Sequence, residues 1–134
     1  MQYRLMIYTA ESVDDGMSEA EMGRVLEAYG RLDAELEEKG AEISSNRLRP
    51  VASATSVRKR NGEFTLTDGP FAETKEQLGG YYLIEAVSLD EAIEWAKKIP
   101  SVEHGTIEVR PIWTMEEDML ETTDGTVREG ASAG

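Results

Sequence analysis

The chain contains one stretch that is too long and too particular for an ordinary loop, the run DGPFAETKEQLGGYY from Asp68 to Tyr82. Aspartate, glycine and proline in succession favour a tight turn, because glycine tolerates unusual backbone angles and proline fixes φ. Proline also suits the first position of a helix, so a short helical turn is expected over Pro70–Glu76. We expect Phe71 to anchor the turn on the core, and the β-rich segment Tyr81–Val87 to form a strand.

A β-hairpin is predicted just before this run. Asn61-Gly62 is the preferred pair for a two-residue type I′ turn, and it joins Ser53–Arg60 to Glu63–Thr67. Such a turn pairs Arg60 with Glu63 and fixes the register of the two strands. Alternation of side chains then gives the hairpin one apolar and one polar face. The apolar face holds Val57, Phe64 and Leu66, and the polar face includes Arg58 and Arg60.

Two helices and three more strands are predicted in the rest of the chain. Ser18 and Ser88 each have a glutamate three residues later, which is the capping-box pattern of a helix start. Gly40 suits the position with positive φ that ends the first helix, and 11–17 is expected to be a polar loop. The first helix has one apolar face, made of Met22, Val25, Leu26, Tyr29, Leu32 and Leu36. The strands are expected over Tyr3–Thr9, Ala41–Leu48 and Thr106–Ile112.

The order of these elements predicts the fold class. Without the hairpin it is β-α-β-β-α-β, the ferredoxin-like split unit of an α+β protein. We therefore predict an antiparallel sheet with two helices on one face and the β-hairpin as an addition. The other sheet face stays open, and a homodimer through this face is the simplest way to cover its aromatic side chains. The domain is expected over 1–115, followed by a polar, mobile tail over 116–134.

Composition excludes several classes of protein. The 134 residues carry a net charge of −13, from 27 acids and 14 bases, and such a field repels nucleic-acid backbones. The chain has no cysteine, which excludes disulfides, thiolate metal sites and a cysteine nucleophile. There is no metal-ligand spacing and no phosphate-binding loop, so we expect neither a metal nor a cofactor. The sequence shows no membrane-spanning run and no signal-peptide pattern, so we expect no membrane partner and a cytoplasmic location.

Two motifs resemble those of a known family. The run Thr67–Gly80, together with GTIEVRP at Gly105–Pro111, resembles the signature of the DGPF branch of the YCII-related family of small bacterial proteins. Weaker likenesses lie at Leu5–Tyr8 and Leu89–Ala92, so the resemblance covers about Tyr3–Ile112. It implies a dimeric ferredoxin-like fold with a cleft between the sheet and the loops.

The resemblance implies two kinds of function. Some YCII-type relatives work on small carboxylated intermediates of catabolism, whereas DGPF-type genes often lie beside genes for alternative sigma factors, which suggests regulation. YCII-type proteins proposed as enzymes usually carry a histidine on the first helix, and Tyr29 occupies that place here. A tyrosine is a poor base at neutral pH, because its ordinary pKa is about 10. This departure weakens the acid–base mechanism that the family implies.

Asp68 and His104 are the candidate catalytic residues. Asp68 is either a functional carboxylate held at a strand end by the Gly-Pro corner, or a turn residue that accepts hydrogen bonds from backbone N–H groups. In the first case it acts as a base or orients a histidine. His104 is the single histidine, and so the one side chain whose ordinary pKa lies near neutrality. It is either a general acid/base or an incidental loop residue between Glu103 and Gly105.

Arginines and one tyrosine are the candidate ligand-binding residues. A guanidinium matches a carboxylate with two parallel hydrogen bonds, so the basic segment that includes Arg47 can attract a small anion to an acidic protein. The other interpretation is a solvated strand face whose cross-strand pairs contribute about 0.2–1 kcal/mol each. Four arginines are candidates for anion binding: Arg47, Arg58, Arg60 and Arg110. The residues chosen for the ligand site are Arg58, Arg60, Arg110 and Tyr29.

Three hypotheses about function remain at this point. The first is a cofactor-independent acid–base enzyme, of the lyase or isomerase type, that acts on a small carboxylated metabolite. The second is a non-catalytic dimer that binds a small ligand or serves sigma-factor control of transcription. In the third, the long run is chiefly structural and locks the fold and the dimer. The sequence does not decide whether the protein is an enzyme.

Overall fold

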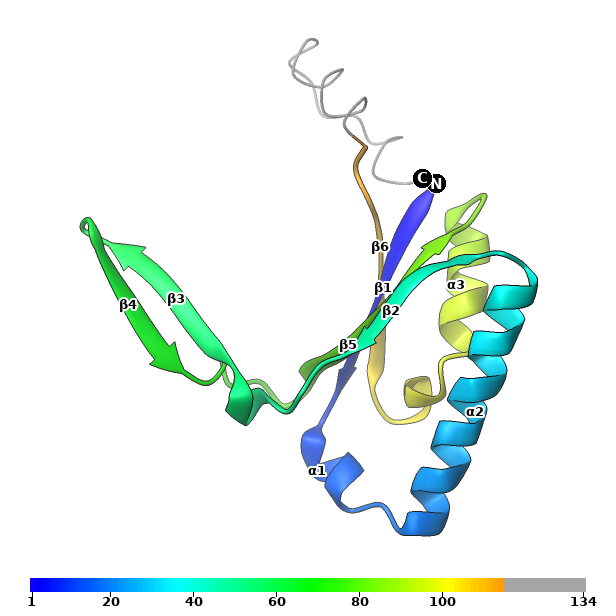
Figure 1. Ribbon diagram of the computed structural model, residues 1–134, viewed down its shortest axis with the longest axis horizontal. Helices are drawn as coiled ribbons and strands as arrows, with labels where there is room; N and C mark the ends of the chain where they lie inside the picture. The colour runs from blue at the N-terminus through cyan, green and yellow to red at the C-terminus, as the bar shows by residue number, and fades with distance from the viewer. Residues whose placement is uncertain (115–134) are drawn as a thin grey trace.

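The computed structural model describes residues 1–114, which form one antiparallel sheet and a separate two-stranded ribbon (Figure 1). The sheet has the strand order β2-β5-β1-β6. Adjacent strands are antiparallel throughout. The four strands are β1 (Gln2–Thr9), β2 (Glu42–Arg47), β5 (Gln77–Glu85) and β6 (Thr106–Pro111). The predicted α+β class and the predicted order of strands and long helices are therefore confirmed.

Two helices, α2 (Glu19–Glu38) and α3 (Leu89–Lys97), cover one face of this sheet and leave the opposite face bare (Figure 1). Short helical segments occupy the connections: α1 (Glu11–Asp15), the 3₁₀ turn η1 (Val51–Ser53) and the 3₁₀ turn η2 (Pro100–Glu103). The loop predicted over 11–17 is thus wrong, since most of it is α1. None of the helices within residues 1–114 is long and apolar enough to cross a membrane.

The predicted helix ends are largely confirmed. Ser18 caps α2, because its side chain accepts from the N–H of Glu21 while the Glu21 carboxylate reaches back to Ser18. Gly40 ends the helix with φ 63°, a conformation that costs glycine little. Ser88 accepts from the N–H of Glu91 at the start of α3, which is half of the predicted box.

The core lies between the sheet and the two helices. Alternate residues of β1, namely Tyr3, Leu5 and Ile7, are buried against the helices, as the period of a strand requires. From α2, Leu32 and Leu36 pack into this core, whereas Leu26 at the other end of the predicted apolar face is 57% exposed. The rest of the buried cluster comes mostly from β5 and α3: Ala41, Tyr82, Ile84, Ala86, Ala92, Trp95, Ala96 and Ile99.

The β-hairpin forms an arm that stands away from the body (Figure 1). It consists of β3 (Thr55–Arg60) and β4 (Glu63–Asp68), which pair only with each other among the described residues. Its register is the predicted one, with Arg60 opposite Glu63. Asn61 and Gly62 have φ of 53° and 81°, as a type I′ turn requires. The arm is on the side of the sheet that the helices leave bare.

The DGPF run differs from its prediction in three ways. No helix forms over 70–76, and β5 starts at Gln77, earlier than predicted. Phe71 is 78% exposed and does not anchor the loop. The corner is held instead through Gly69: its N–H donates to the Ala54 carbonyl (2.7 Å), and its carbonyl accepts from Ser56 Oγ (2.8 Å). Its φ of 97° explains the glycine, because other residues rarely adopt this conformation.

Candidate functional site

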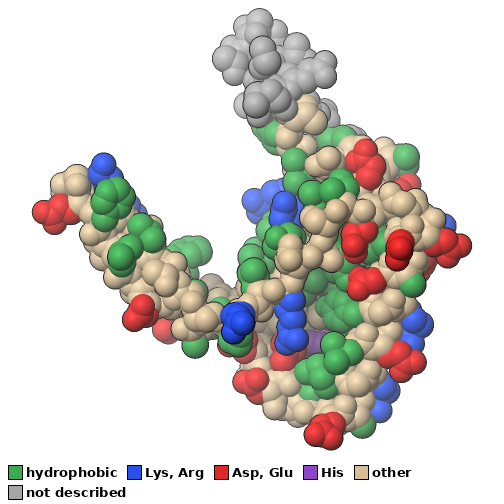
Figure 2. Space-filling view, viewed as in Figure 1, with side chains coloured by type: hydrophobic (Ala, Val, Ile, Leu, Met, Phe, Trp, Pro, Cys, Tyr) green, Lys and Arg blue, Asp and Glu red, His purple; other side chains and the backbone are tan. Residues whose placement is uncertain are grey.

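A cavity of about 300 Å³ lies between α2 and the helix-facing side of the sheet. Figure 2 shows the molecule hollowed between β2 and α2, with basic and apolar side chains at this edge. This volume is at the lower end of the range for small-ligand sites. The lining comes from the sheet (Ile7, Thr9, Ser45, Asn46, Arg47, Gly79, Gly80, Tyr81, Tyr82), from α2 (Met22, Val25, Leu26, Tyr29, Asp33), and from Asp14 and Ser101.

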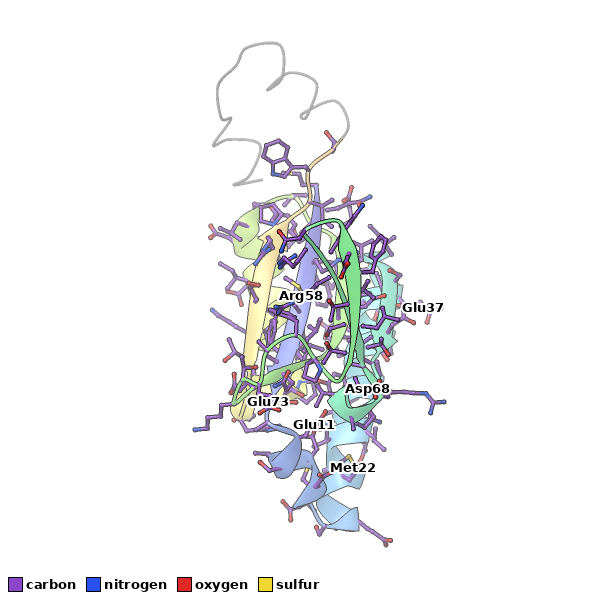
Figure 3. The ribbon with its side chains drawn as sticks, turned by 90° about the vertical axis from the view of Figure 1, so that its left-hand side faces the viewer. Glu11, Met22, Glu37, Arg58, Asp68 and Glu73 are labelled. Carbon is purple, nitrogen blue, oxygen red and sulfur yellow. The ribbon has the colours of Figure 1, made fainter. Side chains whose placement is uncertain are left out.

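Glycine at position 80 lets the strands close tightly beneath the cavity. A Cβ on Gly80 would lie 2.9 Å from the backbone carbonyl oxygen of Asn46 on β2. The apolar part of the wall is formed by side chains of α2, among them Met22, whose position Figure 3 marks. Methionine adapts its shape easily, so this wall can adjust to a ligand.

Tyr29 is fixed in the cavity wall by a hydrogen bond from helix to turn. Its hydroxyl lies 2.6 Å from Ser101 Oγ on η2, and Ser101 is a buried polar residue. Burial raises the pKa of Tyr29 above its ordinary value. The phenol therefore stays protonated at neutral pH and can donate a hydrogen bond to a ligand oxygen. The structure thus places this predicted residue in the cavity, while its role in ligand binding stays a prediction.

Tyr82 and Asp33 form a second hydrogen-bonded pair across the cavity. The Tyr82 hydroxyl donates to Asp33 Oδ1 at 2.7 Å. Burial and this bond to a carboxylate both raise the pKa of Tyr82. Because Asp33 already accepts a hydrogen bond from Tyr82, it is a weaker candidate for a base than an unpaired carboxylate.

Arg47 is the one cation among the cavity-lining residues, all of which lie within the described part of the chain. It is on the exposed edge strand β2, opposite Gly80. Its positive charge acts on Tyr29 and lowers the pKa of that phenol, whereas Asp14 acts in the opposite direction, and both effects are smaller than that of burial. The cavity therefore has a cationic edge at β2 and a carboxylate at α1.

His104 lies next to this carboxylate. Its Nε2 is 3.9 Å from Asp14 Oδ1, which is too long for a hydrogen bond. The same atom is buried and has no hydrogen-bond partner among residues 1–114. The backbone N–H of His104 donates to the carbonyl of Ser101, so the histidine and the Tyr29 partner belong to the same turn. An oxygen atom of a ligand, placed between His104 Nε2 and Asp14 Oδ1, could form hydrogen bonds with both.

Neither His104 nor the remaining predicted site residues, apart from Tyr29, line the cavity. Asp68 and Arg58 are on the arm (Figure 3). Asp68 pairs with Thr55 in the ribbon, and its carboxylate has no hydrogen-bond or ion-pair partner within residues 1–114, so the expected turn bonds to backbone N–H groups are absent there. Strand alternation puts Asp68 on the face opposite to that of Arg58 and Arg60. The structure therefore does not bring Asp68 and His104 together within one copy.

The three predicted arginines each have local partners. Arg58 Nη2 donates weakly to the Phe71 carbonyl at 3.4 Å. Arg60 donates to its neighbour's carbonyl at 2.9 Å. Arg110 is on the bare sheet face, where its Nη2 contacts both carboxylate oxygens of Glu108 at 2.6 and 2.8 Å. None of the three lines the cavity.

The residues chosen from the sequence do not include Asp33, Asp14 and Ser101, which are polar residues of the cavity wall. Asp33 was detectable, because it lies four residues after Tyr29 and therefore on the same side of the helix. Asp14 and Ser101 had no such signal, since both come from short helical connections that meet only in the folded chain. Within residues 1–114 no group of three or more acidic or histidine side chains is arranged to hold a metal ion.

Comparison with known proteins agrees with the two motifs. The sequence model described as the YCII-related domain matches residues 1–116. The chain belongs to the YCII-related domain family. This YCII-related chain is also 40% identical over 114 residues to an uncharacterized protein of Rhizobium meliloti (strain 1021). That alignment covers 84% of this chain and 92% of the relative. The family predicted from the DGPF and GTIEVRP motifs is confirmed, and the relative's description names no activity.

Proposed function

We propose that this YCII-related domain binds a small carboxylated molecule in the cavity between α2 and the sheet. The observation that carries the proposal is the single cationic side chain, Arg47, at the edge of a cavity whose other polar groups include the protonated phenol of Tyr29. A guanidinium binds a carboxylate with two parallel hydrogen bonds. Tyr29 and Ser101 supply hydroxyl groups for the remaining oxygens of the ligand. The apolar wall of α2 suits a short carbon chain.

We further propose acid–base chemistry without a cofactor, with His104 as the group that takes the proton. Its buried Nε2, which has no hydrogen-bond partner within residues 1–114, is the specific observation in favour. Asp14 at 3.9 Å would stabilise the imidazolium after proton transfer, as a carboxylate near a catalytic histidine does. The phenol of Tyr29 would donate to the oxygen on which negative charge develops. Asp68 takes part in this proposal only if a second copy carries it to the cavity.

The alternative is a non-catalytic dimer that binds the same ligand class, with a role in sigma-factor control. The observation in favour is Tyr29, which occupies the place of the histidine that the YCII-type resemblance implies. Both versions include the finer structural proposals: a ferredoxin-like unit, a homodimer through the bare sheet face, and a cytoplasmic location. The antiparallel sheet with helices on one face supports the first of these.

Binding is tested with a panel of two- to six-carbon mono- and dicarboxylates, measured by thermal shift and then by calorimetric titration. We expect at least one acid to bind and Arg47→Ala to weaken it by about tenfold or more, as for loss of a charged hydrogen bond. Arg49→Ala is the matched control, because Arg49 is two residues away and does not line the cavity. Equal effects of the two substitutions, or no binding by any acid, would overturn the proposal.

Turnover is tested by incubating each bound acid with the protein in heavy water and following the loss of carbon-bound hydrogen by NMR. Acid–base catalysis predicts that the wild type exchanges carbon-bound hydrogen of the acid for deuterium. His104→Gln should lose this exchange while it still binds the acid. Binding without exchange would favour the regulatory alternative. Exchange that persists in His104→Gln would exclude His104 as the base and leave the binding proposal intact.

A further inference from the structure

The arm exposes an apolar stripe on one of its faces. Val57, Phe64 and Leu66 are 61%, 72% and 69% exposed, and strand pairing puts them side by side. Lys59 lies over the Phe64 ring at 5.2 Å from its centroid and belongs to the same face. A soluble monomer rarely leaves three large neighbouring apolar side chains this open to water.

Within residues 1–114 of one copy, the strands of the arm pair with no strand of the body. The arm is a two-stranded ribbon, and an isolated ribbon of this kind is marginally stable in water. The hydrogen bonds that its side chains make in the described residues stay within the arm and its base, for example from Ser56 to Gly69 and from Arg58 to Phe71. Figures 1 and 2 show space between the arm and the body, and Figure 3 shows the arm in front of the bare sheet face.

The bare face of the sheet is a second uncovered surface, and its chemistry suits the arm. Its apolar part is partly exposed and consists of Met6, Tyr8, Tyr81 and Leu83, which point away from the helices by strand alternation. Arg4 stacks on the Tyr81 ring at 4.6 Å and lies opposite Arg110 on β6, so two cations share this face with Glu108, which pairs with Arg110. The apolar face of the arm ends in a carboxylate without a partner within residues 1–114, that of Asp68.

Overall charge points to a second copy as the occupant. The chain has 27 acids and 14 bases, whereas the strands of the arm have three bases and two acids. An arm that is less acidic than the rest is therefore attracted to another copy of the same acidic body. A reciprocal arrangement around a twofold axis buries both arms and both bare faces with one kind of contact.

We propose that the apolar face of the arm docks on the bare sheet face of a second copy of this chain, and that the two copies exchange arms reciprocally. The inference rests on the proposed homodimer and specifies how it forms. Phe64 and Leu66 are the central contacts. Asp68 is carried towards the face that holds Arg4 and Arg110, which gives the first residue of the DGPF motif a role in assembly.

Sedimentation velocity over a range of concentrations tests the dimer. We expect the wild type to be a dimer and Phe64→Glu to raise the dissociation constant at least about 30-fold, as for a central interface contact. The matched control is Thr65→Glu, which adds the same charge one residue away on the opposite face. Leu66→Glu is a second variant on the apolar face. Circular dichroism and melting of each variant show whether the core, which contains no residue of the arm, stays folded.

Disulfide trapping then identifies the docking surface, because the natural chain has no cysteine. In the double variant Met6→Cys, Leu66→Cys, arm exchange predicts a cross-linked dimer on a non-reducing gel. The single variants Met6→Cys and Leu66→Cys measure the background, which is the disulfide that forms between the same cysteine of two copies. An intramolecular cross-link without dimer would mean that each arm folds onto its own sheet, and would overturn the proposal.

The remaining outcomes separate this inference from the proposed ligand site. A monomeric wild type overturns both the homodimer and the arm exchange, but not ligand binding, which is measured with the Arg47 variant. If the wild type is a dimer and Phe64→Glu and Thr65→Glu weaken it equally, or not at all, the arm exchange is overturned. The homodimer then forms through another surface.

Discussion

The phenol of Tyr82 and the carboxylate of Asp33 join the centre of the sheet to α2 through a hydrogen bond of 2.7 Å. Tyr82 is 5% exposed, and its ring belongs to the core while its hydroxyl reaches the cavity. This one bond spans 49 residues of sequence. It fixes the position of the helix whose side chains form the apolar wall of the proposed site.

Tyr82→Phe is expected to lower the free energy of unfolding by about 1–2 kcal/mol, because a part-buried hydrogen bond to a carboxylate is lost while the ring still packs. Urea unfolding measures the change. Tyr81→Phe is the control, since the Tyr81 hydroxyl accepts an exposed bond from Asn46 and its loss should cost about 0.5 kcal/mol or less. Similar losses in the two variants would show that the Asp33 bond contributes nothing particular.

Alkaline pH should destabilise the wild type through the same residue. The pKa of Tyr82 is raised in the folded protein by burial and by Asp33, so above about pH 10 the unfolded chain loses this proton first. The stabilising contribution is therefore complete below the unfolded pKa and is lost as the pH rises further. Melting temperatures measured from pH 8 to pH 11 should fall less steeply for Tyr82→Phe. Parallel curves would contradict the linkage.

Glu42→Gln is expected to stabilise the protein at neutral pH. Partial burial, followed by the negative charges of Asp33 and Glu37, raises the pKa of Glu42. The folded state thus holds this proton more tightly than the unfolded state, and stability is lost as the pH rises through the two pKa values. The substitution should raise the free energy of unfolding at pH 7 by less than about 1 kcal/mol, because the side chain is largely exposed. The melting temperature should rise with it. The gain should vanish near pH 3, where the wild-type carboxyl is protonated.

The matched control for that experiment is Glu73→Gln, which removes the same charge from an exposed part of the DGPF run. Both variants raise the net charge equally, so a general relief of acidic repulsion would act on both. An equal gain at position 73 would assign the effect to net charge and not to the site of Glu42.

Two glycine substitutions should have opposite effects. A Cβ on Gly105 would clash with the Tyr8 carbonyl and lie 2.8 Å from Thr9 Cγ2, so Gly105→Ala should cost about 2 kcal/mol or more. Gly23 is exposed on α2 with nothing within 4 Å of a Cβ, so Gly23→Ala should add about 0.5–1 kcal/mol through helix propensity. Chemical denaturation compares both with the wild type. A harmless Gly105→Ala would disprove the tight approach of β6 to β1.

Gly105 also shows which parts of the fold the sequence predicts. Local rules were sufficient for the Ser18 cap, the Asn61-Gly62 turn and the hairpin register, because each depends on a few neighbouring residues. The closing motif was recognisable only as a resemblance, and its first glycine is explained by a contact with a strand nearly a hundred residues earlier. The DGPF corner was misjudged for the same reason: it depends on Ala54, just before the hairpin, and on Ser56 in its first strand.

The candidate site was less predictable than the fold. Of the six residues chosen from the sequence, Tyr29 lines the cavity and His104 lies beside its Asp14 wall. The other four are on the arm or the bare face. Their charge and their place in a motif do not indicate which strands and which sheet face lie beside the cavity. Asp14, Asp33 and Ser101 come from three separate elements, and only the packing of those elements brings them to one cavity.

The connection between β2 and β5 has a consequence for the modular design of the protein. The N–H of Leu48 donates to the carbonyl of Gly79 at 2.9 Å, directly after the pairing of Arg47 with Gly80. The two strands are therefore already one hairpin, and the segment 49–76 is its loop. Loop length adds little entropy once the ends are joined. The segment with the most recognisable motif is thus an insert that the core does not require, and a short turn could replace it without a break in the sheet.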